Sequence, residues 1–274
     1  MKSSLLYGKR ELTIDLPDHI VIHEINKHPM PIVSDVDASV RQAMLAPIGS
    51  PSLPDLARNA NKVCILICDI TRPVPNGALL PPLIEMLMQE GVQKENILIL
   101  VATGLHRPNE GEELRELINN DEIYESFQIE NHFARDRDAH IDLGTTSGGI
   151  PVGIDRRFYD ADLRIATGLV EPHFMAGYSG GRTVVAPGVA YQDTILKFHT
   201  AHVLEHPNAV SCVMDGNPLH EAQMEIIGKI GSVYALNVAI DDKRRLGKVT
   251  FGDIEQSHLC LLYTSDAADD DTIV

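Results

Sequence analysis

Residues 62–108 read KVCILICDITRPVPNGALLPPLIEMLMQEGVQKENILILVATGLHRP, and their pattern sets the expected fold class. The apolar run over 62–68 predicts a central strand, because strands buried on both faces of a parallel sheet lack alternation. A helix-periodic segment over 78–90 follows and is closed by Gly91. A second apolar strand pattern then covers 96–102. This order of strand, loop, helix and strand predicts a doubly wound, Rossmann-like α/β sheet with mostly parallel strands.

The flanking segments extend this pattern in both directions. Further strands are predicted at 127–131, 163–167 and 232–240, and further helices at 36–45, 110–118, 192–206 and 217–229. Near the N-terminus, 12–16 and 19–23 alternate in strand fashion around a Pro-Asp turn, which predicts a β-hairpin. We therefore expect one α/β domain over residues 1–258.

The last residues, 259–274, break the pattern. Residues 260–270 read CLLYTSDAADD, which resembles a translated sequencing adapter. A helix that begins near 253–258 would be interrupted by it. We expect 259–274 to be a non-native tail, so it is set aside when the fold is predicted.

Composition and charge narrow the class of protein. The chain has 274 residues, 44% hydrophobic content and a net charge of −16, as expected of a soluble globular protein. Its apolar runs are only strand-length and its N-terminus lacks a signal-peptide core, which favours the cytoplasm. The negative charge argues against nucleic acid and anionic membranes as partners. The four cysteines show no CxxC pair and are expected to be buried thiols rather than metal ligands.

Three polar loops follow predicted strands and carry ionisable side chains. They read DITRPVPN at 69–76, TGLHRP at 103–108 and GLVEPHFMAGYSGGRT at 168–183. Ligands bind at the carboxyl ends of the strands in open α/β sheets, so the three loops should converge. The loops predict an anion-binding site that contains two histidines, His106 and His173.

These loops resemble the amino-terminal domain of the lactate racemase family. The shared motifs are DxTRPVP from Asp69, ATGxHRP from Ala102, ExHFxAGxSGGR from Glu171, and APG from Ala186 with a histidine downstream. The resemblance extends over residues 45–258. Members of this family are racemases and epimerases of small 2-hydroxyacids, and they use a nickel-pincer nucleotide that dedicated biosynthesis proteins supply.

The resemblance implies a role for each matched side chain. His106 and His173 would be acid/bases on opposite faces of the substrate carbon, while a hydride leaves C2 for the cofactor and returns on the other face. Arg72 would hold the substrate carboxylate. Asp69 would orient a histidine or Arg72, or simply pair with Arg72. His199 would be the nickel ligand, since imidazole suits nickel.

One motif position departs from the family. The family has a lysine after GGR that carries a covalent thioamide link to the cofactor, and this chain has Thr183 there. A hydroxyl cannot form that link. We expect non-covalent binding through His199 and the segment Gly180, Gly181, Arg182 and Thr183. The alternative is a non-catalytic module that binds the cofactor or another phosphorylated ligand.

Other interpretations remain open from the sequence. The family has a second domain that this chain lacks, so the fragment is expected to be inactive. His199, His202 and His206 could share one helical face as a zinc site, and Gly180-Gly181 could be an ordinary turn. A dehydrogenase is disfavoured because no GxGxxG follows the first core strand. The histidines outside the motifs are predicted to be structural: His19, His23, His28, His132, His140, His220 and His258.

Overall fold

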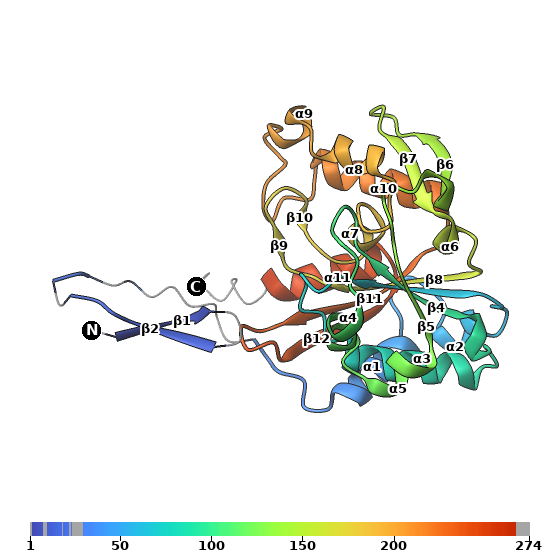
Figure 1. The fold of residues 1–274 in the computed structure, drawn as a ribbon, viewed down its shortest axis with the longest axis horizontal. Helices are drawn as coiled ribbons and strands as arrows, with labels where there is room; N and C mark the ends of the chain where they lie inside the picture. The colour runs from blue at the N-terminus through green and yellow to red at the C-terminus, as the bar shows by residue number, and fades with distance from the viewer. Residues whose placement is uncertain (1, 8–9, 18, 22, 24–29, 267–274) are drawn as a thin grey trace.

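A six-stranded sheet lies at the centre of the computed structural model (Figure 1), with the strand order β12-β11-β8-β3-β4-β5. The strands are β3 (Val63–Cys68), β4 (Ile97–Ala102), β5 (Gln128–Asn131), β8 (Leu163–Leu169), β11 (Tyr234–Ile240) and β12 (Leu246–Asp253). Neighbouring strands from β11 to β5 pair in parallel, and only β12 runs antiparallel to its neighbour β11. The predicted doubly wound α/β sheet is confirmed.

The structure describes residues 2–7, 10–17, 19–21, 23 and 30–266. His28 and residues 267–274, for which predictions were made, lie outside this part of the chain. No helix in the described part is both long enough and apolar enough to cross a membrane.

Helices cover both faces of the sheet. One face carries α1 (Val36–Leu45), α2 (Leu53–Ala57), α3 (Asn76–Gln89), α4 (Gly111–Ile118) and α5 (Asp121–Ser126); the other carries α6 (Arg156–Tyr159), α7 (Arg182–Val185), α8 (Gln192–Phe198), α9 (Ala201–Leu204) and α10 (Pro218–Ile230). In β3, Ile65 and Ile67 pack into the first layer, while Cys64 and Leu66 pack into the second. Burial on both sides explains why this strand is apolar at every position.

Besides the N-terminal hairpin, two short antiparallel pairs of the described residues lie outside the main sheet. One joins β6 (His140–Thr145) to β7 (Pro151–Asp155), and the other joins β9 (Pro172–His173) to β10 (Gly177–Tyr178). The second pair folds the glycine-rich segment back over the end of β8. It therefore belongs to the part of the fold that shapes the site.

The N-terminal hairpin is present, but earlier in the chain than predicted. It consists of β1 (Lys2–Tyr7) and β2 (Arg10–Asp15), in which Tyr7 pairs with Arg10. Residues 19–21 and 23 are not in a strand, so alternation around the Pro-Asp pair placed the turn wrongly. Figure 1 shows the hairpin apart from the main sheet.

Two predicted helices also have different bounds. The segment 192–206 is not one helix, because α8 ends at Phe198 and α9 begins at Ala201. At the other end, α11 spans Gln256–Asp266 and crosses the boundary predicted at 258. Leu261 and Leu262 of this helix are buried. The non-native origin of 259–274 stays a prediction.

Candidate functional site

A cavity of about 440 Å³ opens where β3, β4 and β8 end. The sites predicted from the three loops meet in its wall, as the topology requires. Of the predicted residues, the wall contains Asp69, Arg72, His106, His173, Gly180, Thr183 and His199. Gly181 and Arg182 are not part of it. The cavity brings together three histidines and a guanidinium from segments that lie far apart in the chain.

His106 is held by Asp69 at the mouth of the cavity. His106 Nδ1 lies 2.6 Å from Asp69 Oδ2. The other carboxylate oxygen accepts from the Thr71 amide and hydroxyl. Because an ionised carboxylate only accepts, Nδ1 of a neutral His106 carries the proton. Its Nε2 then presents a lone pair.

His173 has the opposite tautomer. Its Nδ1 accepts from the amides of Met175, at 3.4 Å, and Ala176, at 3.2 Å. The proton of the neutral ring is therefore on Nε2. Burial, together with the positive charges of Arg72 and Arg182, lowers the pKa of His173 to about 4. The ring is neutral at physiological pH and presents a donor.

The Arg72 guanidinium pairs with Glu171 and not with the Asp69 carboxylate. Arg72 Nη1 lies 2.9 Å from Glu171 Oε1. A guanidinium has five N–H groups, and this bond uses one of them. The predicted alternative of an Asp69–Arg72 pair is wrong, because the Asp69 carboxylate bonds to Thr71 and His106 instead.

The glycine-rich turn at residues 180–182 makes hydrogen bonds to neighbouring parts of the protein. Gly180 and Gly181 have φ values of 81° and 47°, which glycine adopts without strain. The Gly181 amide donates to Asn237 Oδ1 at 2.9 Å. Arg182 is buried, and its Nη2 donates to the carbonyls of Ala176 and Tyr178. Burial lowers the pKa of Arg182 to about 10. The cofactor contacts of these residues stay predictions.

Thr183 stands in the cavity wall, at the position where the resemblance implies a lysine. Its Oγ1 donates to the Gly180 carbonyl at 3.1 Å. The side chain is therefore turned toward its own backbone. The residue does not fit a covalent tether.

His199 fits a metal ligand in its tautomer. It follows the last residue of α8, and its Nδ1 donates to the Ile195 carbonyl at 2.8 Å. This hydrogen bond places the proton of the neutral ring on Nδ1 and leaves the lone pair of Nε2 to coordinate a metal. His202 lies beyond the helix break, and no group of three or more His, Cys, Asp or Glu ligands occurs in the described residues. The continuous histidine face needed for the zinc alternative is absent from this part of the chain.

Two further residues contribute to the cavity and were not predicted from the sequence. Glu171 begins the quoted motif but was assigned no partner. Gln223 lines the cavity from α10, and its Nε2 donates to the Ala186 carbonyl at 2.7 Å. The only sequence signal for Glu171 was its place beside His173, and Gln223 has none, because its helix reaches the site only through tertiary packing.

The fold and this cavity define an α/β protein whose strand-end cavity is lined by a guanidinium and by three histidines. Residues 7–211 match the family described as the lactate racemase N-terminal domain. The chain belongs to the lactate racemase family, as the motifs predicted.

Similar proteins agree with this assignment. The lactate racemase of Thermoanaerobacterium thermosaccharolyticum is 32% identical over 255 residues, which cover 92% of this chain and 59% of that protein. The lactate racemase of Lactiplantibacillus plantarum is 30% identical over 261 residues, covering 93% and 60%. This chain thus spans three fifths of the length of these relatives.

Solved structures support the same fold. The lactate racemase apoprotein from T. thermosaccharolyticum matches with a TM-score of 0.84 at 32% identity, covering 96% of this chain and 61% of that one. A protein from Thermotoga maritima matches with a TM-score of 0.68 at 22% identity, covering 88% and 60%. The second likeness concerns the fold alone.

Proposed function

We propose that this chain is the substrate-binding and proton-exchanging part of a 2-hydroxyacid racemase or epimerase. The observation that carries the proposal is the single cavity in which Arg72, His106 and His173 meet. The two lactate racemases that match most of the chain support it. The enzyme would act in the cytoplasm on a small hydroxyacid.

Substrate binding begins with the carboxylate. Arg72 would hold it with two parallel N–H donors. A guanidinium offers this bidentate geometry to a carboxylate, and a lysine ammonium group does not. Glu171 keeps the Arg72 side chain at the cavity wall. A carboxylate held there leaves the C2 hydroxyl to face the histidines.

Proton exchange follows from the two tautomers. His106 Nε2 would accept the hydroxyl proton, and Asp69 would stabilise the resulting imidazolium through Nδ1–H. His173 would donate from Nε2 to a substrate oxygen. For Nε2 of His173 to act as a base, its proton must move to Nδ1, which then loses the bonds from the Met175 and Ala176 amides. The two histidines are therefore unequal in this state of the site.

The family cofactor fits this wall without a covalent link. His199 Nε2 would hold its nickel, and the turn at Gly180 and Thr183 lies in the same wall. When bound, the nickel-pincer nucleotide supplies the hydride-accepting carbon. Loading by the cofactor biosynthesis proteins would precede activity.

The test adds the part of the relatives' length that this chain does not span. We would join this chain to the C-terminal part of the T. thermosaccharolyticum racemase and produce it with the cofactor biosynthesis proteins. The expected result is racemisation of L-lactate or a larger 2-hydroxyacid by the chimera, and none by the 274-residue chain. Nickel near one per chain, with cofactor released on denaturation, is expected. Covalent cofactor in a Thr183→Lys variant would be the matched control.

A second candidate is a non-catalytic binding module, and Thr183 is the observation that favours it. In that case the chimera would retain cofactor or nickel but convert no hydroxyacid. Absence of both nickel and cofactor, in a chimera whose Thr183→Lys variant is loaded, would contradict the enzyme and favour a module that binds another phosphorylated ligand.

A further inference from the structure

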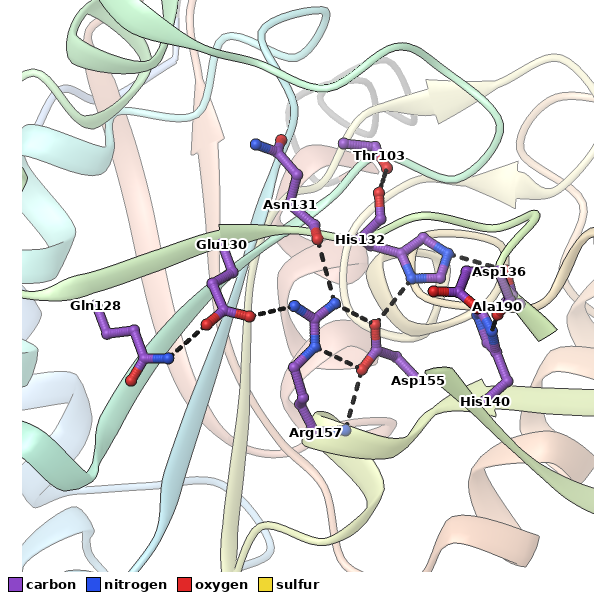
Figure 2. A network of polar contacts seen from close by, with 10 residues as sticks. All are labelled: Thr103, Gln128, Glu130, Asn131, His132, Asp136, His140, Asp155, Arg157 and Ala190. Carbon is purple, nitrogen blue, oxygen red and sulfur yellow. Dashed lines mark hydrogen bonds and ion pairs between the residues drawn. The ribbon is translucent and has the colours of Figure 1, made fainter. Parts of the chain in front are cut away.

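His132 is buried and connects two segments of the site, the loop that begins at Thr103 and the segment that ends at Ala190. Its amide donates to the Val101 carbonyl at 3.0 Å, and its own carbonyl accepts from Thr103 Oγ1 at 2.7 Å. Its ring Nδ1 lies 3.1 Å from Asp155 Oδ2, and its Nε2 lies 3.0 Å from the Ala190 carbonyl oxygen. Figure 2 shows the ring between these two oxygens.

The ring faces an acceptor at each nitrogen. A carboxylate and a carbonyl oxygen cannot donate, so each bond requires a proton on the ring nitrogen. The side chains of His132 and Asp155 are both fully buried, with no exposed area. A neutral ring would turn one lone pair toward an oxygen where no water relieves the repulsion. Both nitrogens therefore carry protons.

The charges around His132 balance the positive charge that a second ring proton would add. Arg157 Nη2 lies 2.6 Å from Asp155 Oδ2, and the same guanidinium reaches Glu130. Burial alone would raise the pKa of Asp155, but hydrogen bonds from His132 and Arg157 outweigh it and hold that pKa below its usual value. Two carboxylates then face one guanidinium and one imidazolium, which sum to zero.

The adjacent ring does not compete for this proton. His140 lies with its ring centroid 5.0 Å from that of His132. Its Nδ1 donates to the Asp136 carbonyl at 2.6 Å. Burial lowers the pKa of His140, so this ring is neutral. Two neighbouring buried histidines thus have different protonation.

The bonds of His132 lead to the cavity on two sides. Thr103 begins the loop of His106, whose amide donates to the Thr103 carbonyl at 2.9 Å. Ala190 ends the segment in which Gly188 lines the cavity. These segments also meet directly, since the Gly104 amide donates to the Gly188 carbonyl at 2.9 Å.

We propose that His132 is a buried imidazolium that positions the His106 loop against the segment that ends at Ala190. His132 is a positioning residue, because its main-chain carbonyl bonds to Thr103 and its ring bonds to Ala190, and it touches neither substrate nor cofactor itself. Its importance for turnover rests on the proposed function. Its protonation and its effect on the His106 ring are measured without turnover, so the two proposals can fail separately.

The first test counts ring protons in the 274-residue chain. With ¹⁵N-labelled histidine at neutral pH, NMR should show one-bond N–H correlations at both ring nitrogens of His132, and at only one in His140. The signals are assigned by their loss in His132→Gln. A single protonated nitrogen in His132 overturns the proposal, whatever the variants do.

The second test separates the two ring bonds. His132→Asn keeps a donor near Nδ1 for Asp155, and His132→Gln keeps a donor near Nε2 for Ala190. Both should shift the His106 Nδ1–H signal, because each releases one anchor. The control, His140→Gln, alters the neighbouring buried ring, which hydrogen-bonds to Asp136 and to neither segment, and should leave that signal in place. An unchanged His106 signal in both folded His132 variants overturns the positioning role.

Discussion

The described residues contain two histidine–aspartate pairs, one exposed at the cavity and one buried in the core. His106 and Asp69 lie at the cavity, where the His106 side chain is 63% exposed and Asp69 is 7% exposed. His132 and Asp155 lie in the core with neither side chain exposed. In each pair Nδ1 meets a carboxylate oxygen, at 2.6 Å and 3.1 Å.

The second ring nitrogen makes the difference between the pairs. His106 lines the cavity and bonds to Asp69 through Nδ1, whereas Nε2 of His132 bonds to the Ala190 carbonyl. Arg157 adds a cation beside Asp155, and Asp69 has the Thr71 hydroxyl instead. A histidine–aspartate pair therefore indicates chemistry only when the outer nitrogen is available to a ligand.

The largest expected effect comes from removing the available nitrogen. His106→Asn keeps a donor to Asp69 and deletes Nε2, so racemisation by the chimera should fall by about 100- to 10,000-fold. Stability should change by less than about 0.5 kcal/mol, because the side chain is exposed. Initial rates and urea midpoints measure the two quantities. A rate within tenfold of the unmodified chimera would exclude His106 as the base.

Breaking the buried pair should affect stability instead. Asp155→Asn removes the carboxylate shared by His132 and Arg157, which should cost about 3–5 kcal/mol in the free energy of unfolding. Asp69→Asn is the matched control and should cost about 1 kcal/mol. Urea unfolding of the 274-residue chain provides both numbers. Equal losses in the two variants would show that burial does not distinguish the pairs.

A third buried histidine sharpens the contrast because it has no carboxylate. His258 Nε2 lies 2.8 Å from the Ser179 carbonyl, and burial together with Arg182 lowers the pKa of His258 to about 3. An unfolded histidine has a pKa of about 6.5. Below that pH the unfolded chain binds more protons than the folded chain. Stability from His258 is therefore present above pH ~6.5 and declines as the pH falls toward the folded value.

His258→Gln keeps a donor to Ser179 and cannot titrate. Between pH ~6.5 and ~4.5, the variant should lose about 2 kcal/mol less unfolding free energy than the native chain. Urea unfolding at a series of pH values gives this difference. Parallel pH profiles would mean that His258 is not held neutral in the fold.

Local pattern was enough to predict the sheet and the loops of the cavity. The apolar runs of β3 and β4 reflect burial on both faces, and parallel strands place the loops of Asp69 and His106 at one edge. The helix break before His199 was not predictable, since the helical period continues through it. The bonds of His132 also escaped prediction, because Ala190 lies 58 residues away and contributes only a carbonyl.

The smallest expected effect tests how Asp69 acts on His106. In Asp69→Asn, an amide N–H replaces the oxygen facing Nδ1, so the neutral ring should move its proton to Nε2. The ¹⁵N signals of His106 would exchange their pyrrole-like and pyridine-like positions, while those of His132 stay unchanged. Racemisation by the chimera should fall about tenfold, because an exposed ring can still reorient. If the His106 tautomer were unaltered, solvent and not Asp69 would set it, and the exposed pair would have no part in orienting the base.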